Sequence, residues 1–231
     1  MGIVPRALSD GERDVIREKP PTNSAYRARR LALTLGDVMP SALLSACNLT
    51  RSQVSEFSSS GYLVVRNLVS AVTAARFEAI TRSLPARRVI CRIPQISWDE
   101  QSVPRAHALY ELFASSPLKN AVTELLGGKV YFCNLTCWIS RYRVGEHISR
   151  HTDAGGTLQI LLMLKPVAAA QGGVLKLVTD SGALALDLRE GDALLFRATS
   201  IIHFTTPLAS TPECPDPIRV VAVGRYFFDD A

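Results

Sequence analysis

The feature that most constrains the fold is a succession of short apolar segments in the second half of the chain, each separated from the next by glycine or proline. Their length and β-branched content are typical of strands, and no helical pattern lies between them. Strands that follow one another without crossover helices favour antiparallel pairing in a sandwich or barrel over a parallel βαβ fold. We expect strands over residues 129–144, 157–165, 173–179, 183–188, 192–198 and 219–228.

The first half of the chain carries mostly helical patterns. Residues 51–60 favour a short helix, and residues 71–84 favour a second helix with apolar side chains at helical spacing. Residues 61–65 favour a buried strand because they are rich in β-branched and aromatic side chains. A third helix is expected over residues 116–127, where Ser116 can cap the start and two glycines end it. These helices are expected to cover one face of the sheet.

Length and composition indicate one folded unit preceded by an extension. The chain has 231 residues, of which 47% are hydrophobic, so it can bury one substantial core. Residues 1–30 are polar, contain prolines and show no sustained period, as extensions do. A single domain is therefore expected over residues 31–231, with helical support over 31–128 and a strand-rich core over 129–228.

Charge and hydropathy limit the expected partners. No apolar run approaches the roughly 20 residues of a membrane helix, and no signal-type stretch begins the chain, so we expect a cytoplasmic protein without membrane contact. The net charge is +5, with much of the basic excess in residues 13–30. Nucleic-acid binding favours aromatic side chains among such charges, and Tyr26 is the only one there. We therefore expect a solvated arm and no nucleic-acid partner, while the oligomeric state stays open.

A possible metal site lies among the predicted strands. His151 and Asp153 are separated by one residue, and His203 follows fifty-two residues after His151. On an extended segment the side chains at i and i+2 point to the same side, so His151 and Asp153 can share one ion. Two imidazoles and one carboxylate on one face of an octahedral ion leave about three positions open, an arrangement that suits iron(II). A histidine and an aspartate at this spacing also occur together by chance, so the surrounding sequence has to show whether they are metal ligands.

The segments on either side of His151 and Asp153 resemble those of a known family. Their order along the chain is similar to that of the 2-oxoglutarate and iron(II)-dependent dioxygenase superfamily, in particular its prolyl-hydroxylase-like branch. A looser likeness to phytanoyl-CoA-hydroxylase-like members covers residues 54–66. The main likeness covers residues 129–228 and rests on Arg141 to Gly145, His151 to Asp153, Leu161 to Lys165, Gly172 to Leu175, Gly191 to Phe196, His203, Pro207 and Arg219.

The resemblance implies a mainly β fold with flanking helices around a double-stranded β-helix, the jelly-roll or cupin-like core. It makes residues 31–231 a catalytic domain. It implies that His151, Asp153 and His203 hold iron(II), with 2-oxoglutarate and dioxygen as cosubstrates. Arg219 would bind the distal carboxylate of 2-oxoglutarate, since a guanidinium can hold a carboxylate with two hydrogen bonds.

Two features qualify the cosubstrate site. Residues 211–217 separate His203 from Arg219 by more than is usual in the family. Tyr142 corresponds to a family tyrosine near the cosubstrate, although a tyrosine in a strand can equally be part of the core. Both residues are predicted to bind 2-oxoglutarate.

The resemblance also implies a type of reaction. Asp153 keeps a carboxylate where related halogenases have a small residue, so oxygenation is expected in place of halogenation. Hydroxylation is the expected outcome, with desaturation or cyclisation as alternatives. The expected substrate is a small anion such as an amino acid or a specialised-metabolite intermediate, in a biosynthetic role. A hydroxylase or demethylase acting on protein or nucleic acid is the alternative, and a cupin-like barrel that binds a ligand without turnover is a third.

Alternation along the strands predicts a substrate pocket. If Arg219 points inward, Arg225 does also, and we expect Arg225 to bind an anionic group of the substrate. The alternative is that Arg225 reaches water or a surface acid. Trp138 and Gln159 are candidate pocket residues by the same counting.

Two further histidines are not expected to bind the metal. His147 lies four residues before His151 and has no carboxylate at the matching spacing, so a supporting or surface role is expected. His107 lies outside any ligand pattern and is expected to be a surface or packing residue.

Overall fold

The structure is a computed structural model that describes residues 48–91, 96–128 and 130–230. The predicted extension over residues 1–30 lies outside this part of the chain. In chain order the elements are α3 (Arg51–Ser60), β1 (Tyr62–Val65), α4 (Ala71–Thr81), β2 (Arg87–Cys91), β3 (Ile96–Ser102), α5 (Ala108–Ala114), α6 (Ser116–Leu125), β4 (Val130–Tyr142), β5 (Leu158–Lys165), the 3-10 turn η2 (Ala169–Gln171), β6 (Leu175–Thr179), β7 (Gly182–Leu186), β8 (Ala193–Phe196), β9 (His203–Thr205) and β10 (Arg219–Asp230).

The strands form two antiparallel sheets. A seven-stranded sheet has the order β1-β8-β5-β10-β4-β3-β2, and a three-stranded sheet has the order β7-β6-β9. Strands β5 to β10 alternate between the two sheets in jelly-roll fashion, with β6, β7 and β9 in the smaller one. The predicted fold class, a mainly β jelly-roll with flanking helices, is confirmed.

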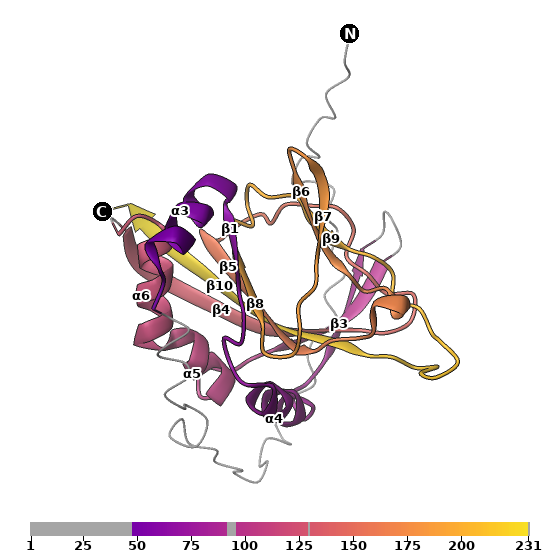
Figure 1. Ribbon diagram of the computed structural model, residues 1–231. Helices are drawn as coiled ribbons and strands as arrows, with labels where there is room; N and C mark the ends of the chain where they lie inside the picture. Colours follow the sequence, from indigo (N-terminus) through magenta and orange to yellow (C-terminus); the bar gives the residue numbers. More distant parts are fainter. Residues whose placement is uncertain (1–47, 92–95, 129, 231) are drawn as a thin grey trace.

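Alternation along β10 divides the interior into two cores. Ala222 and Tyr226 belong to the core that lies between the helices and the seven-stranded sheet. Val221 and Val223 belong to the second core, between the two sheets. Figure 1 shows α3, α5 and α6 on one side of the large sheet and β6, β7 and β9 on the other. Because successive side chains point to opposite faces, one strand serves both cores.

The predicted helices are present, with one difference at a cap. Thr50 and Gln53 form a capping box at the start of α3, and Gly61 ends that helix in the left-handed region at φ 75°. Helix α6 begins at Ser116, as expected, but Ser115 is its N-cap and makes no side-chain capping hydrogen bond. The prediction that Ser116 caps the helix is therefore wrong, since Ser116 is already helical. None of the described helices is long and apolar enough to span a membrane.

Strands β2 and β3 were not expected, and they extend the large sheet beyond β4. Each strand carries two charged side chains, and these form ion pairs across the two strands. Arg88 Nη1 lies 2.9 Å from Asp99 Oδ1, and Arg87 forms an ion pair with Glu100. The segment predicted as helical support thus also contains three strands, β1, β2 and β3.

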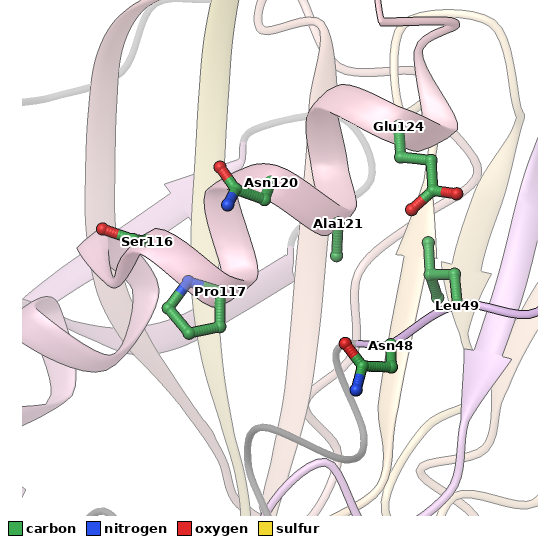
Figure 2. Close-up of a pocket in the computed structure, with 7 residues that line it drawn as sticks. All are labelled: Asn48, Leu49, Ser116, Pro117, Asn120, Ala121 and Glu124. Carbon is green, nitrogen blue, oxygen red and sulfur yellow. The ribbon is translucent and has the colours of Figure 1, made fainter.

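A pocket lies beside α6, outside the two sheets. Figure 2 shows its lining residues, all from α6 or from the segment just before α3. They are Asn48, Leu49, Ser116, Pro117, Asn120, Ala121 and Glu124. None of them belongs to β9 or to the segment between β4 and β5, which carry the predicted metal ligands.

Replacing Gly224 by alanine tests how closely α5 packs on the large sheet. A Cβ at Gly224 would meet Phe113 Cδ1 at 2.8 Å and Phe113 Cγ at 2.9 Å. Overpacking a well-filled core costs about 1–3 kcal/mol. We expect Gly224→Ala to lower the free energy of unfolding, measured in urea, by about that amount.

Gly155→Ala is the matched control. A Cβ there would meet only Phe227 Cε1, at 3.7 Å, an ordinary contact. We expect the control to leave the unfolding free energy within about 1 kcal/mol of the wild-type value. Equal stability of the two variants would contradict the packing described for β10 and α5.

Candidate metal centre

The main chain brings the two predicted histidine ligands opposite each other. His151 and His203 form an antiparallel bridge in which His151 N donates to His203 O at 3.1 Å and His203 N donates to His151 O at 2.9 Å. Directly paired residues of an antiparallel ladder place their side chains on one face. The imidazole rings accordingly lie with their centroids 4.2 Å apart.

Asp153 joins them from the same segment as His151. Its backbone N–H donates to the Ala198 carbonyl at 2.8 Å, which fixes the chain two residues beyond His151. His151 Nε2 lies 3.6 Å from Asp153 Oδ1. One ligand atom from each of His151, Asp153 and His203 lies within 4.8 Å of the others, so the three predicted ligands form one cluster.

Hydrogen bonds to the main chain determine which nitrogen of each histidine is free. Nδ1 of His151 lies 2.7 Å from the Ser149 carbonyl oxygen, and Nδ1 of His203 lies 3.0 Å from the Ile201 carbonyl oxygen. A carbonyl oxygen only accepts, so each Nδ1 carries the proton and donates it. Both Nε2 lone pairs are therefore free to bind a metal, in the tautomer that such hydrogen bonds fix at metal sites.

The surroundings set the protonation states that a metal site needs. Burial, followed by the nearby His151, lowers the pKa of His203 to about 4, so this imidazole is neutral at pH 7. Burial alone would raise the pKa of Asp153, but the neighbouring His151 and the charge of Arg225 lower it further than burial raises it. A neutral imidazole and an ionised carboxylate are the forms that bind a cation.

The carboxylate of Asp153 has one oxygen beside the imidazoles and pairs the other with a cation. Oδ2 is buried and accepts no aligned hydrogen bond from a described residue, although Arg225 Nη2 lies 2.9 Å away as an ion-pair partner. A buried carboxylate oxygen is costly unless a charge compensates it, and Arg225 provides that charge for Oδ2, so Oδ1 is the oxygen left for a metal. Two free imidazole nitrogens and this carboxylate therefore fit a divalent cation that accepts mixed nitrogen and oxygen ligands, such as iron(II).

Arg219 is a buried cation on the same inner face of β10. It is 3% exposed, and no acid lies within ion-pairing distance of it among the described residues. Burial lowers its pKa, yet an arginine stays charged at neutral pH. Its cross-strand partner is Tyr142, and its Cζ lies 5.4 Å from the centre of the Tyr142 ring. Such a charge is suited to receiving an anion from outside the chain.

Tyr142 forms the wall beside Arg219. Burial raises its pKa to about 12, with the Arg219 charge and the Ser140 hydroxyl acting in the opposite direction, so the phenol keeps its proton. Its ring stacks on Trp98, with centroids 6.5 Å apart. The phenol is therefore available as a hydrogen-bond donor close to the Arg219 guanidinium.

The three predicted substrate-pocket residues lie together beside Asp153. Arg225 Nε donates to Gln159 Oε1 at 2.9 Å, and Arg225 Cζ lies 4.9 Å from the Trp138 ring centre. The counting that put these side chains on the inner face therefore holds, because β10 pairs with β4 on one side and β5 on the other. Their role in substrate binding remains a prediction.

The remaining histidines lie apart from the cluster. His107 is the N-cap of α5, where its Nδ1 accepts from Leu109 N at 3.1 Å, and burial lowers its pKa. His147 Nδ1 faces the Gly145 carbonyl at 3.3 Å. The cluster contains neither residue.

One residue that supports the site was missed from the sequence. Gly156, at φ +86°, lies against Arg225, and a Cβ there would meet Arg225 Cγ at 2.5 Å. The glycine pair after Asp153 was the available signal. Without knowledge of the strand pairing, nothing in the sequence connected Gly155 and Gly156 to Arg225.

Comparison with known proteins supports the fold. No protein-family model matches this sequence, and no curated protein matches it by sequence. Among solved structures, a Pseudomonas putida prolyl-4-hydroxylase has 16% identity and a TM-score of 0.63, over 76% of this chain and 97% of that one. The epimerase SnoN from nogalamycin biosynthesis, alpha-ketoglutarate dependent, has 16% identity and a TM-score of 0.62, over 76% of this chain and 81% of that one.

A third similar structure is a prolyl hydroxylase from Trichoplax adhaerens in complex with a peptide fragment of hypoxia inducible factor. It has 17% identity and a TM-score of 0.60, over 80% of this chain and 91% of that one. At such identities the likeness establishes the fold alone. That fold is the one implied by the resemblance to the prolyl-hydroxylase-like branch of the 2-oxoglutarate oxygenases.

Arg219→Met tests whether the Arg219 charge is unpaired in the ligand-free protein. A buried charge without a partner is costly, and an apolar side chain of similar length removes that cost. We expect the free energy of unfolding of the variant, measured in urea without added anions, to equal that of the wild type or to exceed it by up to roughly 1 kcal/mol. A loss of stability of several kcal/mol would show that Arg219 has a partner within the protein.

Proposed function

We propose that this protein is a mononuclear non-haem iron(II) dioxygenase that uses 2-oxoglutarate as its cosubstrate. The carrying observation is the pairing of two kinds of site on one inner face: a cluster of two imidazoles and a carboxylate, and a buried arginine that has no acid partner among the described residues. The first fits the metal and the second fits the distal carboxylate of a dicarboxylic acid. The shared fold with 2-oxoglutarate oxygenases supports the same reading.

The protein's own atoms provide the binding functions. The Nε2 atoms of His151 and His203 and the carboxylate of Asp153 would hold the iron, leaving about three positions for exogenous ligands. When bound, the iron supplies dioxygen activation coupled to the conversion of 2-oxoglutarate to succinate and carbon dioxide. Arg219 would hold the distal carboxylate with its planar fork, and the Tyr142 hydroxyl would donate a further hydrogen bond.

The apolar core between the sheets would separate these charges from water. Val221 and Val223 lie between Arg219 and Arg225 on β10, and Leu161 and Met163 face them from β5. In such a dry environment the Arg219 charge attracts a carboxylate more strongly than it would in water. The same side chains would hold the cosubstrate in one orientation and keep water from the reacting centre.

Hydroxylation is the proposed outcome, with desaturation and cyclisation as alternatives. Solved structures of similar fold include an epimerase and a carbocyclase as well as prolyl hydroxylases, so this fold is compatible with several products. Function is decided by the site and not by the fold. The position of the substrate carbon relative to the metal would decide the product here.

A small anionic substrate is proposed for the open side of the site. Arg225 is 23% exposed, and its Nη1 donates no hydrogen bond to a described residue, while its Nε and Nη2 face Gln159 and Asp153. The guanidinium can therefore still receive a carboxylate from a bound molecule. We propose an amino acid or a biosynthetic intermediate as the substrate class. The alternative, a macromolecular substrate, relies on the basic arm, which lies outside the described residues.

Succinate formation tests the use of 2-oxoglutarate. We expect the wild-type protein with iron(II) and oxygen to convert 2-oxoglutarate to succinate. We expect Arg219→Met to bind 2-oxoglutarate at least about 30-fold more weakly than the wild type, because truncating one partner of a buried charge pair costs about 2 kcal/mol or more.

Arg197→Met is the matched control. The Arg197 guanidinium lies over Phe57, on the helix side of the sheet, and no described residue hydrogen-bonds to its Nε. Equal 2-oxoglutarate affinity in Arg219→Met and Arg197→Met would contradict the assignment.

Paired ligands test the anionic substrate. Candidate amino acids and their carboxamides differ by one charge, and binding can be followed with iron(II) and 2-oxoglutarate present and oxygen excluded. We expect the carboxylate to bind about 10-fold or more tightly than its amide, because a hydrogen bond to a charged group is worth about 1.5–3 kcal/mol. Equal affinity for every pair that binds would remove the anionic preference.

A further inference from the structure

The two oxygens of Asp153 lie in different environments. Oδ1 lies 3.6 Å from His151 Nε2, on the side where the imidazoles converge. Oδ2 lies 2.9 Å from Arg225 Nη2 and is buried. One oxygen therefore faces the other ligands and the other faces a cation from β10.

Arg225 is fixed in place from three directions. Its Nε donates to Gln159 Oε1 at 2.9 Å, and its guanidinium lies over the Trp138 ring at 4.9 Å. On a third side, Gly156 leaves room for the aliphatic stem, since a Cβ there would meet Arg225 Cγ at 2.5 Å and Cδ at 2.8 Å. Neighbours that restrain a long side chain in this way turn a mobile charge into a fixed one.

We infer that Arg225 is the positioning residue of Asp153 and makes it a one-oxygen ligand, an inference that rests on the proposed iron site. Turning both carboxylate oxygens toward the metal would separate Oδ2 from Arg225 in a largely buried place. Breaking a buried ion pair is costly, so Arg225 holds the carboxylate in the orientation in which Oδ1 faces the metal. A second coordinating oxygen would occupy one of the positions that the cosubstrates need.

This role differs from simple charge compensation. If Arg225 acted only through its positive charge, its removal would strengthen metal binding, because a cation near the site repels another cation. If it acts by orienting Asp153, its removal weakens metal binding even though the repulsion is gone. The direction of the change therefore separates the two roles.

Cobalt(II) titration of the full chain, without 2-oxoglutarate and followed by visible absorption, measures that direction. We expect Arg225→Met to bind cobalt(II) about 10–100-fold more weakly than the wild type, which is typical of losing a group that orients a metal ligand. Arg225→Lys keeps the charge but not the planar fork, and should be weakened in the same range. Tighter or unchanged cobalt(II) binding in Arg225→Met would overturn the inference.

Two further variants keep the test decisive. Arg150 precedes His151 in the sequence, and its guanidinium lies 5.5 Å from the Phe204 ring centre. The Arg150→Met variant should bind cobalt(II) as tightly as the wild type does. If Arg225→Met does not fold, Gln159→Met loosens Arg225 without removing it, and should weaken cobalt(II) binding several-fold. Unchanged affinity in Gln159→Met would then count against the inference. A wild-type protein that does not bind cobalt(II) would instead overturn the proposed iron site itself.

Discussion

The paired main-chain hydrogen bonds between His151 and His203 are the constraint on which the site depends. They join the segment after β4 to β9, and β9 is itself held on β6, where His203 pairs with Leu177. Because the register of a ladder determines which side chains face each other, a shift by one residue would turn one imidazole away. The metal ligands are thus placed by the smaller sheet, although it supplies only one of them from a regular strand.

Strand β10 connects that cluster to the rest of the molecule. Its inner face carries Arg219 near one end and Arg225 further along, with valines between them, while its outer face packs against the helices. The central position of β10, between β5 and β4, keeps both arginines at fixed depths in the interior. Each has a different surrounding: Arg225 lies against Asp153, and Arg219 has no acid partner among the described residues. The stability of the fold and the chemistry proposed for the site therefore depend on the same strand.

Short-range rules made much of this accessible from the sequence. Alternation with period two placed Arg219, Arg225, Gln159 and Trp138 on inner faces, because successive side chains of a strand point to opposite sides. The same counting put His151 beside Asp153, in a segment that forms only an isolated bridge. The strands β2 and β3 were missed because charged residues interrupt their apolar positions, and the ion pairs that join the two strands connect residues that no local pattern links. The contact of Arg225 with Asp153 was missed for a related reason. It depends on Gly156, whose missing side chain gains meaning only once β10 lies beside it.

The central claim is that His151, Asp153 and His203 together bind iron(II) to which 2-oxoglutarate then coordinates. Its most direct test is the visible charge-transfer absorption of the full chain after iron(II) and 2-oxoglutarate are added without oxygen. A band is predicted for the wild type, and no band for Asp153→Ala or His203→Ala at the same concentrations, since each removes one ligand of the cluster. The account would be contradicted if the wild type showed no band, or if both variants showed a band as strong as that of the wild type.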